Sequence, residues 1–216
     1  MDGLSLRRRI ALDIARSMRK SQEEEHPLRQ LFWECTLRCN LHCRHCGSDC
    51  KQVAATPDMP KEDFFKVLDS IAAKTDPHKV FVIISGGEPT MRADLEECGK
   101  GIYSRGFPWG MVTNGFGMTA ERFSRLLGAG LHSMTVSLDG LEENHDWLRG
   151  REGSFTRAVE TIRMAVQSGI AFDVVTCVNR RNYPQLPQLK EFLIGLGLKE
   201  WRLFSIFPQG RAALNP

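Results

Sequence analysis

The segment KVFVIISGGEP occupies residues 79–89. Its first seven residues form a nearly continuous apolar run, which is typical of a β-strand that is covered on both of its faces. Strands of this kind belong to parallel sheets, whose ligands bind at the carboxyl ends of the strands. The segment therefore predicts a buried parallel strand over 79–85, followed by a glycine-rich loop at 86–89 that faces a ligand.

Segments with the patterns of strands and of helices alternate around this one. Further strands are predicted at residues 31–36, 109–113, 132–138, 171–178 and 199–206, and helices at 61–74, 93–104, 120–127, 154–167 and 183–196. Thr119 and Ser154 are the expected caps of the helices at 120–127 and 154–167. This alternation demands parallel strands joined by right-handed crossovers. A closed eight-stranded barrel typically needs ~250 residues. We therefore expect an α/β fold in the form of a partial (β/α)6 TIM-like barrel, with a flat doubly wound sheet as the alternative.

The N-terminal residues predict a helix that precedes this fold. Leu6, Ile10, Ile14 and Met18 are spaced four residues apart, which places them on one face of a helix. We expect this face to pack against the body of the protein. The chain then divides into a helical extension at residues 1–30 and a core domain at residues 31–216.

Composition excludes several classes of protein. The 216 residues are 42% hydrophobic and 25% charged, which is ordinary for a globular chain. A formal net charge of +3 is too small to indicate a nucleic-acid partner or a membrane surface. No segment is apolar for long enough to span a bilayer, and Asp13 and Arg16 interrupt the stretch that a signal peptide would need. We expect a cytoplasmic protein.

The cysteines indicate a metal site. Five of the seven lie between residues 35 and 50, a clustering that favours metal ligation under reducing conditions over disulfides. Cys39, Cys43 and Cys46 follow the first predicted strand with the spacing Cys-x3-Cys-x2-Cys. Three thiolates can hold three irons of a [4Fe–4S] cluster and leave the fourth iron open, whereas most electron-transfer clusters have four cysteine ligands. The spacing thus predicts chemistry at the open iron.

Two other interpretations of the cysteines stay open. A zinc ion could be held if His42, His45 or Cys50 completed a set of four ligands. The cysteines at 43, 46 and 50 also give the reversed spacing, although the forward spacing begins directly after the strand. The remaining cysteines are expected to be packed thiols: Cys35, Cys98 and Cys177.

Polar or glycine-rich residues follow every predicted strand. They are the cysteine loop, Gly86-Gly87-Glu88-Pro89, Thr113-Asn114-Gly115, Ser137-Leu138-Asp139-Gly140, Asn179 and Gln209-Gly210-Arg211. Because the carboxyl ends of parallel strands lie at one end of the sheet, these loops predict a single ligand-binding face.

This combination resembles the radical SAM superfamily. The matching elements are the three-cysteine motif within WECTLRCNLHCRHC at 33–46, GGEP at 86–89 and SLDG at 137–140. They span nearly the whole chain from about residue 31. The flanking text, which includes HDWLRG and GSF, resembles peptide-modifying enzymes that often carry a C-terminal SPASM extension, with a lipoprotein-associated subgroup as the nearest match. No cysteine follows Cys177, so we expect a core that lacks this extension and is a fragment of a longer protein.

The resemblance implies a role for each matching position. Cys39, Cys43 and Cys46 would ligate one [4Fe–4S] cluster, whose open iron binds S-adenosylmethionine. The other implied cofactor contacts are Gly86, Gly87 and Glu88 to the methionine amino group, Ser137 and Arg149 to its carboxylate, and His45 near the adenine. Asn114 is a further candidate contact, and Arg211 is a candidate neighbour of the adenosine.

The resemblance also implies a reaction. An electron from a reductase, flavodoxin or ferredoxin would cleave S-adenosylmethionine to a 5′-deoxyadenosyl radical, which abstracts hydrogen from a peptide or protein substrate. This step needs no side-chain general base, so no further catalytic residue is nominated. Cofactor biosynthesis on a tetrapyrrole or nucleotide is the alternative enzyme activity. A non-catalytic iron–sulfur or zinc-binding module is the alternative of another class.

Overall fold

The computed structural model describes residues 5–214 of the chain. Six parallel strands form one sheet in the order β1-β2-β3-β4-β5-β6. The strands are β1 (Gln30–Thr36), β2 (Phe81–Gly86), β3 (Trp109–Thr113), β4 (Leu131–Ser137), β5 (Ala171–Val178) and β6 (Trp201–Ser205). A doubly wound sheet would reverse its strand order at a switch point. The sequential order therefore confirms the partial TIM-like barrel and removes the flat alternative.

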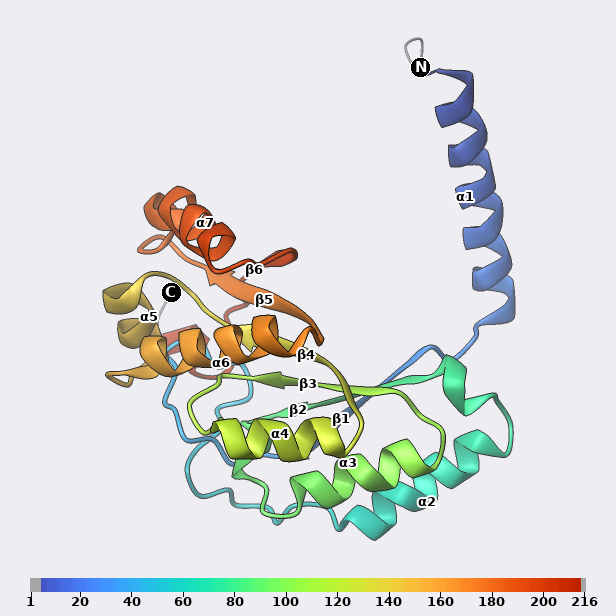
Figure 1. Cartoon of the computed structure of the whole chain (residues 1–216), viewed down its shortest axis with the longest axis horizontal. Coiled ribbons are helices and arrows are strands. Elements are labelled where there is room, and N and C mark those ends of the chain that lie inside the picture. Colours follow the sequence, from blue (N-terminus) through green and yellow to red (C-terminus); the bar gives the residue numbers. More distant parts are fainter. Residues whose placement is uncertain (1–4, 215–216) are drawn as a thin grey trace.

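Helices connect successive strands along the outer side of the curved sheet (Figure 1). They are α2 (Lys61–Ala72), α3 (Leu95–Ser104), α4 (Ala120–Gly128), α5 (Glu142–Arg149), α6 (Ser154–Ser168) and α7 (Leu186–Gly195). The core between sheet and helices is apolar, and Trp33 of β1 stacks on Phe64 of α2 with ring centroids 3.9 Å apart. Because all six strands run in the same direction, the loops that follow their carboxyl ends lie together at one end of the sheet.

The helix ends partly follow the predicted capping. Thr119 caps α4, because its side-chain oxygen accepts a hydrogen bond of 3.1 Å from the backbone N–H of Arg122. Ser154 does not cap α6 as the sequence suggested. Gly153 occupies the cap position, and the Asp146 carboxylate of α5 accepts hydrogen bonds from the backbone N–H groups of Gly153 and Phe155 at 2.7 Å. Helix α5 itself was not predicted.

The N-terminal helix α1 (Leu6–Glu25) forms as predicted but does not pack on the body. Figure 1 shows it projecting away from the sheet. Leu6 is 73% exposed and Met18 is 59% exposed, so the prediction of a packed apolar face is wrong for this structure. Within residues 5–214, no helix combines the length and the apolar character that crossing a membrane requires.

Candidate functional site

A cavity of about 260 Å³ lies at the carboxyl ends of the first four strands. Its wall brings together every residue that the sequence predicted for the cofactors, from segments far apart in the chain. These residues are Cys39, Cys43, His45, Cys46, Gly86, Gly87, Glu88, Asn114, Ser137 and Arg149.

The three predicted ligand cysteines are available for a metal. All three are free thiols; Cys39 and Cys43 are buried, and Cys46 is half-buried. Burial raises the pKa of Cys39 to about 12 and also raises that of Cys43. Ligation by iron must therefore displace the thiol protons, as is usual for cysteine sites. Cys50 lines the same cavity, whereas His42 is exposed.

The glycines of the GGEP loop allow the loop to lie against the cysteine loop. A Cβ atom at Gly87 would overlap the backbone carbonyl oxygen of Arg38, and one at Gly86 would overlap that of Thr36. Gly86 also has a φ of +113°, which favours glycine. The backbone N–H of Gly87 donates a hydrogen bond of 2.8 Å to the carbonyl of Thr36. Close backbone approach is thus the local reason for both glycines.

The Glu88 carboxylate is buried and accepts four hydrogen bonds. Its donors are the hydroxyl of Thr113 and the backbone N–H of Asn114, both at 2.7 Å, together with the hydroxyl and backbone N–H of Thr90 at 2.8 and 3.2 Å. Burial raises the pKa of Glu88, and these hydrogen bonds oppose the rise. Glu88 therefore joins the loop after β2 to the loop after β3. This structural role was not predicted from the sequence.

Asn114 connects the loop after β3 to the cysteine loop. Its side-chain nitrogen donates a hydrogen bond of 2.9 Å to the side chain of Asn40 and lies 3.8 Å from the sulfur of Cys39. Its side-chain oxygen accepts a hydrogen bond of 2.8 Å from the backbone N–H of Phe116. The amide is therefore oriented by protein groups on both sides.

Arg149, at the end of α5, forms a buried ion pair with Asp139. Its Nε lies 2.6 Å from an Asp139 carboxylate oxygen, and its Nη1 lies 3.8 Å from the sulfur of Cys43. Burial acts to raise the pKa of Asp139, but the charge of Arg149, together with the two neighbouring histidines and the backbone N–H of Cys177, holds the pKa below its usual range. The sequence predicted Asp139 only as part of a loop that follows a strand, and its complete burial reveals its role in placing Arg149.

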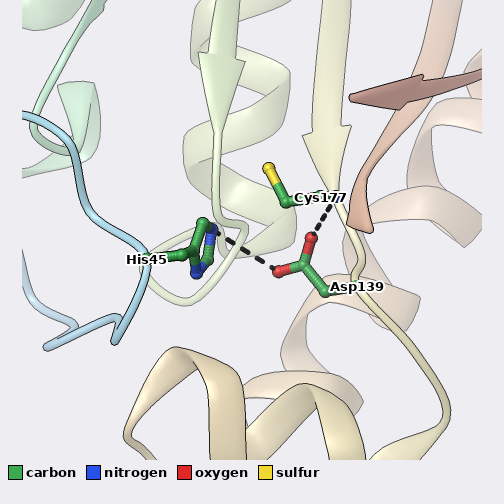
Figure 2. A group of neighbouring side chains, drawn as sticks. All are labelled: His45, Asp139 and Cys177. Atoms are coloured by element: carbon green, nitrogen blue, oxygen red, sulfur yellow. Dashed lines mark hydrogen bonds and ion pairs between the residues drawn. The ribbon is translucent and has the colours of Figure 1, made fainter. Parts of the chain in front are cut away.

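His45, Asp139 and Cys177 lie together beside the cavity (Figure 2). The Nε2 of His45 is 3.9 Å from the Asp139 carboxylate, which also accepts a hydrogen bond of 2.8 Å from the backbone N–H of Cys177. Burial, then the charge of Arg149, lowers the pKa of His45 to about 4. Because Arg149 already neutralises Asp139, this group is a poor cation site. Cys177 is half-buried here and is not the core thiol that was expected.

Arg211 fastens the cysteine loop from the opposite end of the chain. Its guanidinium donates hydrogen bonds of 2.8 and 2.9 Å to the carbonyls of Cys43 and Cys50, and its backbone N–H donates one of 2.9 Å to the carbonyl of Cys46. It also bonds the Asp49 carboxylate at 2.8 Å. Arg211 lines the cavity, and these contacts hold the cysteine loop in place, a role that was not predicted from the sequence.

The family model described as the radical SAM superfamily matches residues 33–193. The sheet forms a partial barrel, and the loops that follow its strands enclose a single cavity lined by the cysteines. The matched residues cover most of this structure. The chain belongs to the radical SAM superfamily. This membership confirms the prediction of a [4Fe–4S] cluster and S-adenosylmethionine as its cofactors, and the three free thiols and the glycine-lined wall of the cavity fit them.

Individual relatives differ in their substrates. The AdoMet-dependent heme synthase of Oleidesulfovibrio alaskensis is 30% identical over 201 residues, which are 92% of this chain and 51% of that protein. The PqqA peptide cyclase of Methylocella silvestris is 28% identical over 192 residues, with coverage of 86% and 51%. The chain therefore spans about half the length of the curated relatives that it matches.

Solved structures show the same fold. The crystal structure of Streptococcus suis SuiB bound to S-adenosylmethionine superposes with a TM-score of 0.71 at 17% identity, covering 96% of this chain and 48% of that one. At this identity the likeness supports the architecture of six parallel strands in a partial barrel.

Proposed function

We propose that this chain is the catalytic core of a radical SAM enzyme that cleaves S-adenosylmethionine reductively and abstracts hydrogen from an organic substrate. The observation that carries this proposal is the single cavity that contains all ten predicted cofactor residues. They come from five separate segments of sequence, so their convergence follows from the fold.

Cys39, Cys43 and Cys46 would hold the cluster through their thiolates. When bound, the cluster and S-adenosylmethionine supply a 5′-deoxyadenosyl radical that can abstract a hydrogen atom. The protein places the reactants and excludes water. Glu88 and Asn114 fix the cavity wall through hydrogen bonds, which limits the positions that a bound cofactor can adopt.

The other cavity residues would bind the methionine end and the adenine of the cofactor. Gly86 and Gly87 leave the backbone accessible to the methionine amino group. Arg149, with Ser137 in the same wall, would hold the carboxylate, because a guanidinium matches a carboxylate in geometry and charge. His45, which is neutral at pH 7 given its lowered pKa, would lie against the adenine.

Both predicted substrate classes have support among the relatives. The heme synthase, at 30% identity, supports a tetrapyrrole or a related cofactor precursor. The PqqA peptide cyclase, at 28% identity, supports a peptide substrate and with it the peptide-modifying subgroup. We place the cofactor precursor first because the heme synthase is the more similar of these two relatives, at 30% identity over 201 residues against 28% over 192 residues. A flavodoxin, ferredoxin or reductase would supply the electron.

The proposed activity is tested by anaerobic reconstitution with iron and sulfide. Addition of dithionite and S-adenosylmethionine should produce 5′-deoxyadenosine, measured by chromatography. Cys39→Ala, Cys43→Ala and Cys46→Ala should each abolish the product. Cys98→Ala, in the apolar core away from the cavity, should keep it. A complete cluster that yields no 5′-deoxyadenosine would contradict the proposal.

Cys50 provides the control for the reversed spacing and for zinc. Cys50→Ala should retain both the brown colour of the cluster and the formation of 5′-deoxyadenosine, because the forward motif supplies three ligands without it. Loss of product in Cys50→Ala together with its retention in Cys39→Ala would establish the reversed spacing. A colourless preparation that contains zinc would instead favour the non-catalytic module.

A further inference from the structure

Helix α1 presents an exposed apolar face. Four side chains form it, spaced four residues apart and between 51% and 73% exposed: Leu6, Ile10, Ile14 and Met18. Each step of four residues turns by about 40° around the helix axis, so the face spreads over about 120°. Apolar faces of this width normally pack against a larger apolar surface. Figure 1 shows α1 projecting away from the sheet, so the body of the protein does not supply that surface.

The opposite face of α1 is basic. Residues 6–20 contain six basic side chains and a single acidic one, Asp13. Five of the basic side chains lie on the side away from the apolar face, and all five are exposed: Arg8, Arg9, Arg16, Arg19 and Lys20. Leu12 is the one large apolar residue among them. The small net charge of the whole chain therefore conceals a local concentration of positive charge.

Most of this positive charge is available to a partner. Arg16 pairs with Asp13 at 3.4 Å, and both side chains are largely exposed. Within residues 5–214, no carboxylate lies within ion-pair distance of the other four basic side chains on that face. An anionic partner can thus approach these four without first breaking an ion pair.

The charges of α1 do not stabilise the helix itself. Its first turn holds no acidic residue and its last turn holds no basic residue. Arginines occupy residues 7–9 near its start, and glutamates occupy residues 23–25 at its end. Both arrangements oppose the helix dipole, which favours acidic residues at the start and basic residues at the end. Because most helices in proteins are stabilised by packing of their amphipathic face, this pattern indicates an external partner.

A second copy of this chain is a poor match for α1. Two helices that pair as a coiled coil need apolar residues that repeat every 3.5 residues on average, which keeps one line of contact along both helices. The apolar residues of α1 keep a strict spacing of four, so its face rotates steadily around the helix axis. A broad surface accepts such a face better than a narrow partner helix does.

The surface of an anionic lipid bilayer complements both faces of α1. Its acyl chains accept the apolar side chains, and its headgroups attract the basic ones, each of which strengthens binding by about fivefold. A helix with one apolar and one basic face lies in the plane of the membrane interface. The glutamates at 23–25 would be repelled by the same surface, which limits the contact to residues 6–20.

The place of α1 in the fold suits attachment to a surface. α1 ends at Glu25 and β1 begins at Gln30, so the helix joins the sheet at the amino end of the first strand. The cofactor cavity lies at the carboxyl ends of the strands. A protein that is attached through α1 would therefore keep this cavity open.

We propose that α1 binds the protein to the surface of an anionic lipid bilayer without crossing it. The four apolar side chains of its exposed face insert among the acyl chains, and the basic side chains contact the lipid phosphates. This inference goes beyond the proposed function, since it concerns where the protein is held and does not depend on the reaction.

Sedimentation of the full chain with lipid vesicles tests this inference. The chain should bind vesicles made of about equal amounts of phosphatidylcholine and phosphatidylglycerol much more tightly than vesicles of phosphatidylcholine alone, and added salt should weaken the binding. Arg8→Gln, Arg9→Gln and Arg19→Gln combined should weaken it by about 100-fold. The matched control removes the same charge from exposed positions elsewhere and should bind normally: Lys74→Gln, Arg163→Gln and Lys190→Gln combined.

A second variant tests the apolar face. Ile10→Gln combined with Ile14→Gln keeps the charges and the helix-forming character of α1, and should weaken binding to the anionic vesicles by at least about tenfold. An unchanged urea midpoint verifies that each variant is folded.

Equal binding to the two kinds of vesicle, no binding to either, or an equal loss in the matched charge control would overturn the inference. A dimer in solution that the Ile10 and Ile14 variant dissociates, together with no binding to anionic vesicles, would also overturn it and would indicate that a second copy of the chain covers this face. Light scattering after gel filtration measures that dimer.

Discussion

The wall of the cofactor cavity leaves no room for a side chain at Gly87. An added Cβ would overlap the carbonyl group of Arg38, which is backbone and cannot rotate away. We expect Gly87→Ala to lower the free energy of unfolding by about 1–3 kcal/mol, as for other overpacked positions. Urea denaturation of the apoprotein measures this loss. Gly128→Ala is the control, since its added Cβ meets no atom within 4 Å beyond its chain neighbours and the backbone of its own helix, and a comparable loss there would contradict the steric explanation.

The buried ion pair of Asp139 and Arg149 gives a second prediction about the stability of single-residue variants. Asp139→Asn leaves the guanidinium buried without its counter-charge, so we expect a loss of about 3–5 kcal/mol of stability. Asp63→Asn removes an exposed pair with Lys66, whose side chains are 52% and 77% exposed, and should cost about 0–1 kcal/mol. Urea denaturation at pH 7 measures both losses of stability. Similar losses in the two variants would contradict the claim that the buried pair contributes more to stability than an exposed pair does.

The same pair predicts how stability changes with pH. The pKa of Asp139 is lower in the folded protein than in the unfolded chain, so its contribution is complete above the unfolded pKa, about 4, and is lost as pH falls through the folded value. Asp139→Asn should therefore lose less stability on acidification than the natural sequence does. Parallel acid titrations followed by circular dichroism measure this difference, and identical slopes would contradict it.

Single residues show why the sequence predicted the residues that line the cavity but not the residues that hold them in position. Cys39, Gly87 and Glu88 stand in short motifs whose spacing can be read directly. Arg211 acts across a long separation, because it bonds a carbonyl 168 residues earlier in the chain, and Asp139 accepts a hydrogen bond from the backbone N–H of Cys177, 38 residues later. A charged residue in a turn or near a terminus gives no local sign of burial, so only the fold reveals that role.

At the scale of elements, apolar periodicity predicted the strands and the long helices. β3 and β5 have the predicted bounds, because each is a short apolar run between turn residues. Helix α5 escaped prediction because its sequence, EENHDWLR, lacks a broad apolar stripe. Its stability depends on tertiary contacts, including the hydrogen bonds that Asp146 accepts from the start of α6.

Helix α1 gives the element-scale prediction. Because its apolar side chains are exposed, removal of residues 1–26 should leave the urea midpoint of the remaining chain unchanged. Phe64→Ala in α2 is the contrast, because its buried ring stacks on Trp33 and its loss should cost about 3–5 kcal/mol. A lower midpoint after truncation would mean that α1 packs on the core in solution, as its apolar spacing first suggested.

At the scale of the whole molecule, the open barrel brings its first and last loops together. The cysteine loop follows β1, and the short helical turn Gly210–Leu214 follows β6, at the other edge of the sheet. Arg211 joins them by donating hydrogen bonds to carbonyls within the cysteine loop. The position of the cluster ligands therefore depends on the complete set of six strands.

This dependence predicts that Arg211 controls retention of the cluster although it offers no ligand atom. Arg211→Gln removes the hydrogen bonds that orient the carbonyls of Cys43 and Cys50, so the three thiolates lose part of their preorganisation. Substitutions that affect metal ligands indirectly typically weaken metal binding by about 10- to 100-fold. Iron release to a chelator should accelerate by a comparable factor in the reconstituted protein. Arg202→Gln, a half-exposed position on β6, should release iron at the natural rate, and equal rates in all three proteins would show that the two ends of the barrel are not coupled through this contact.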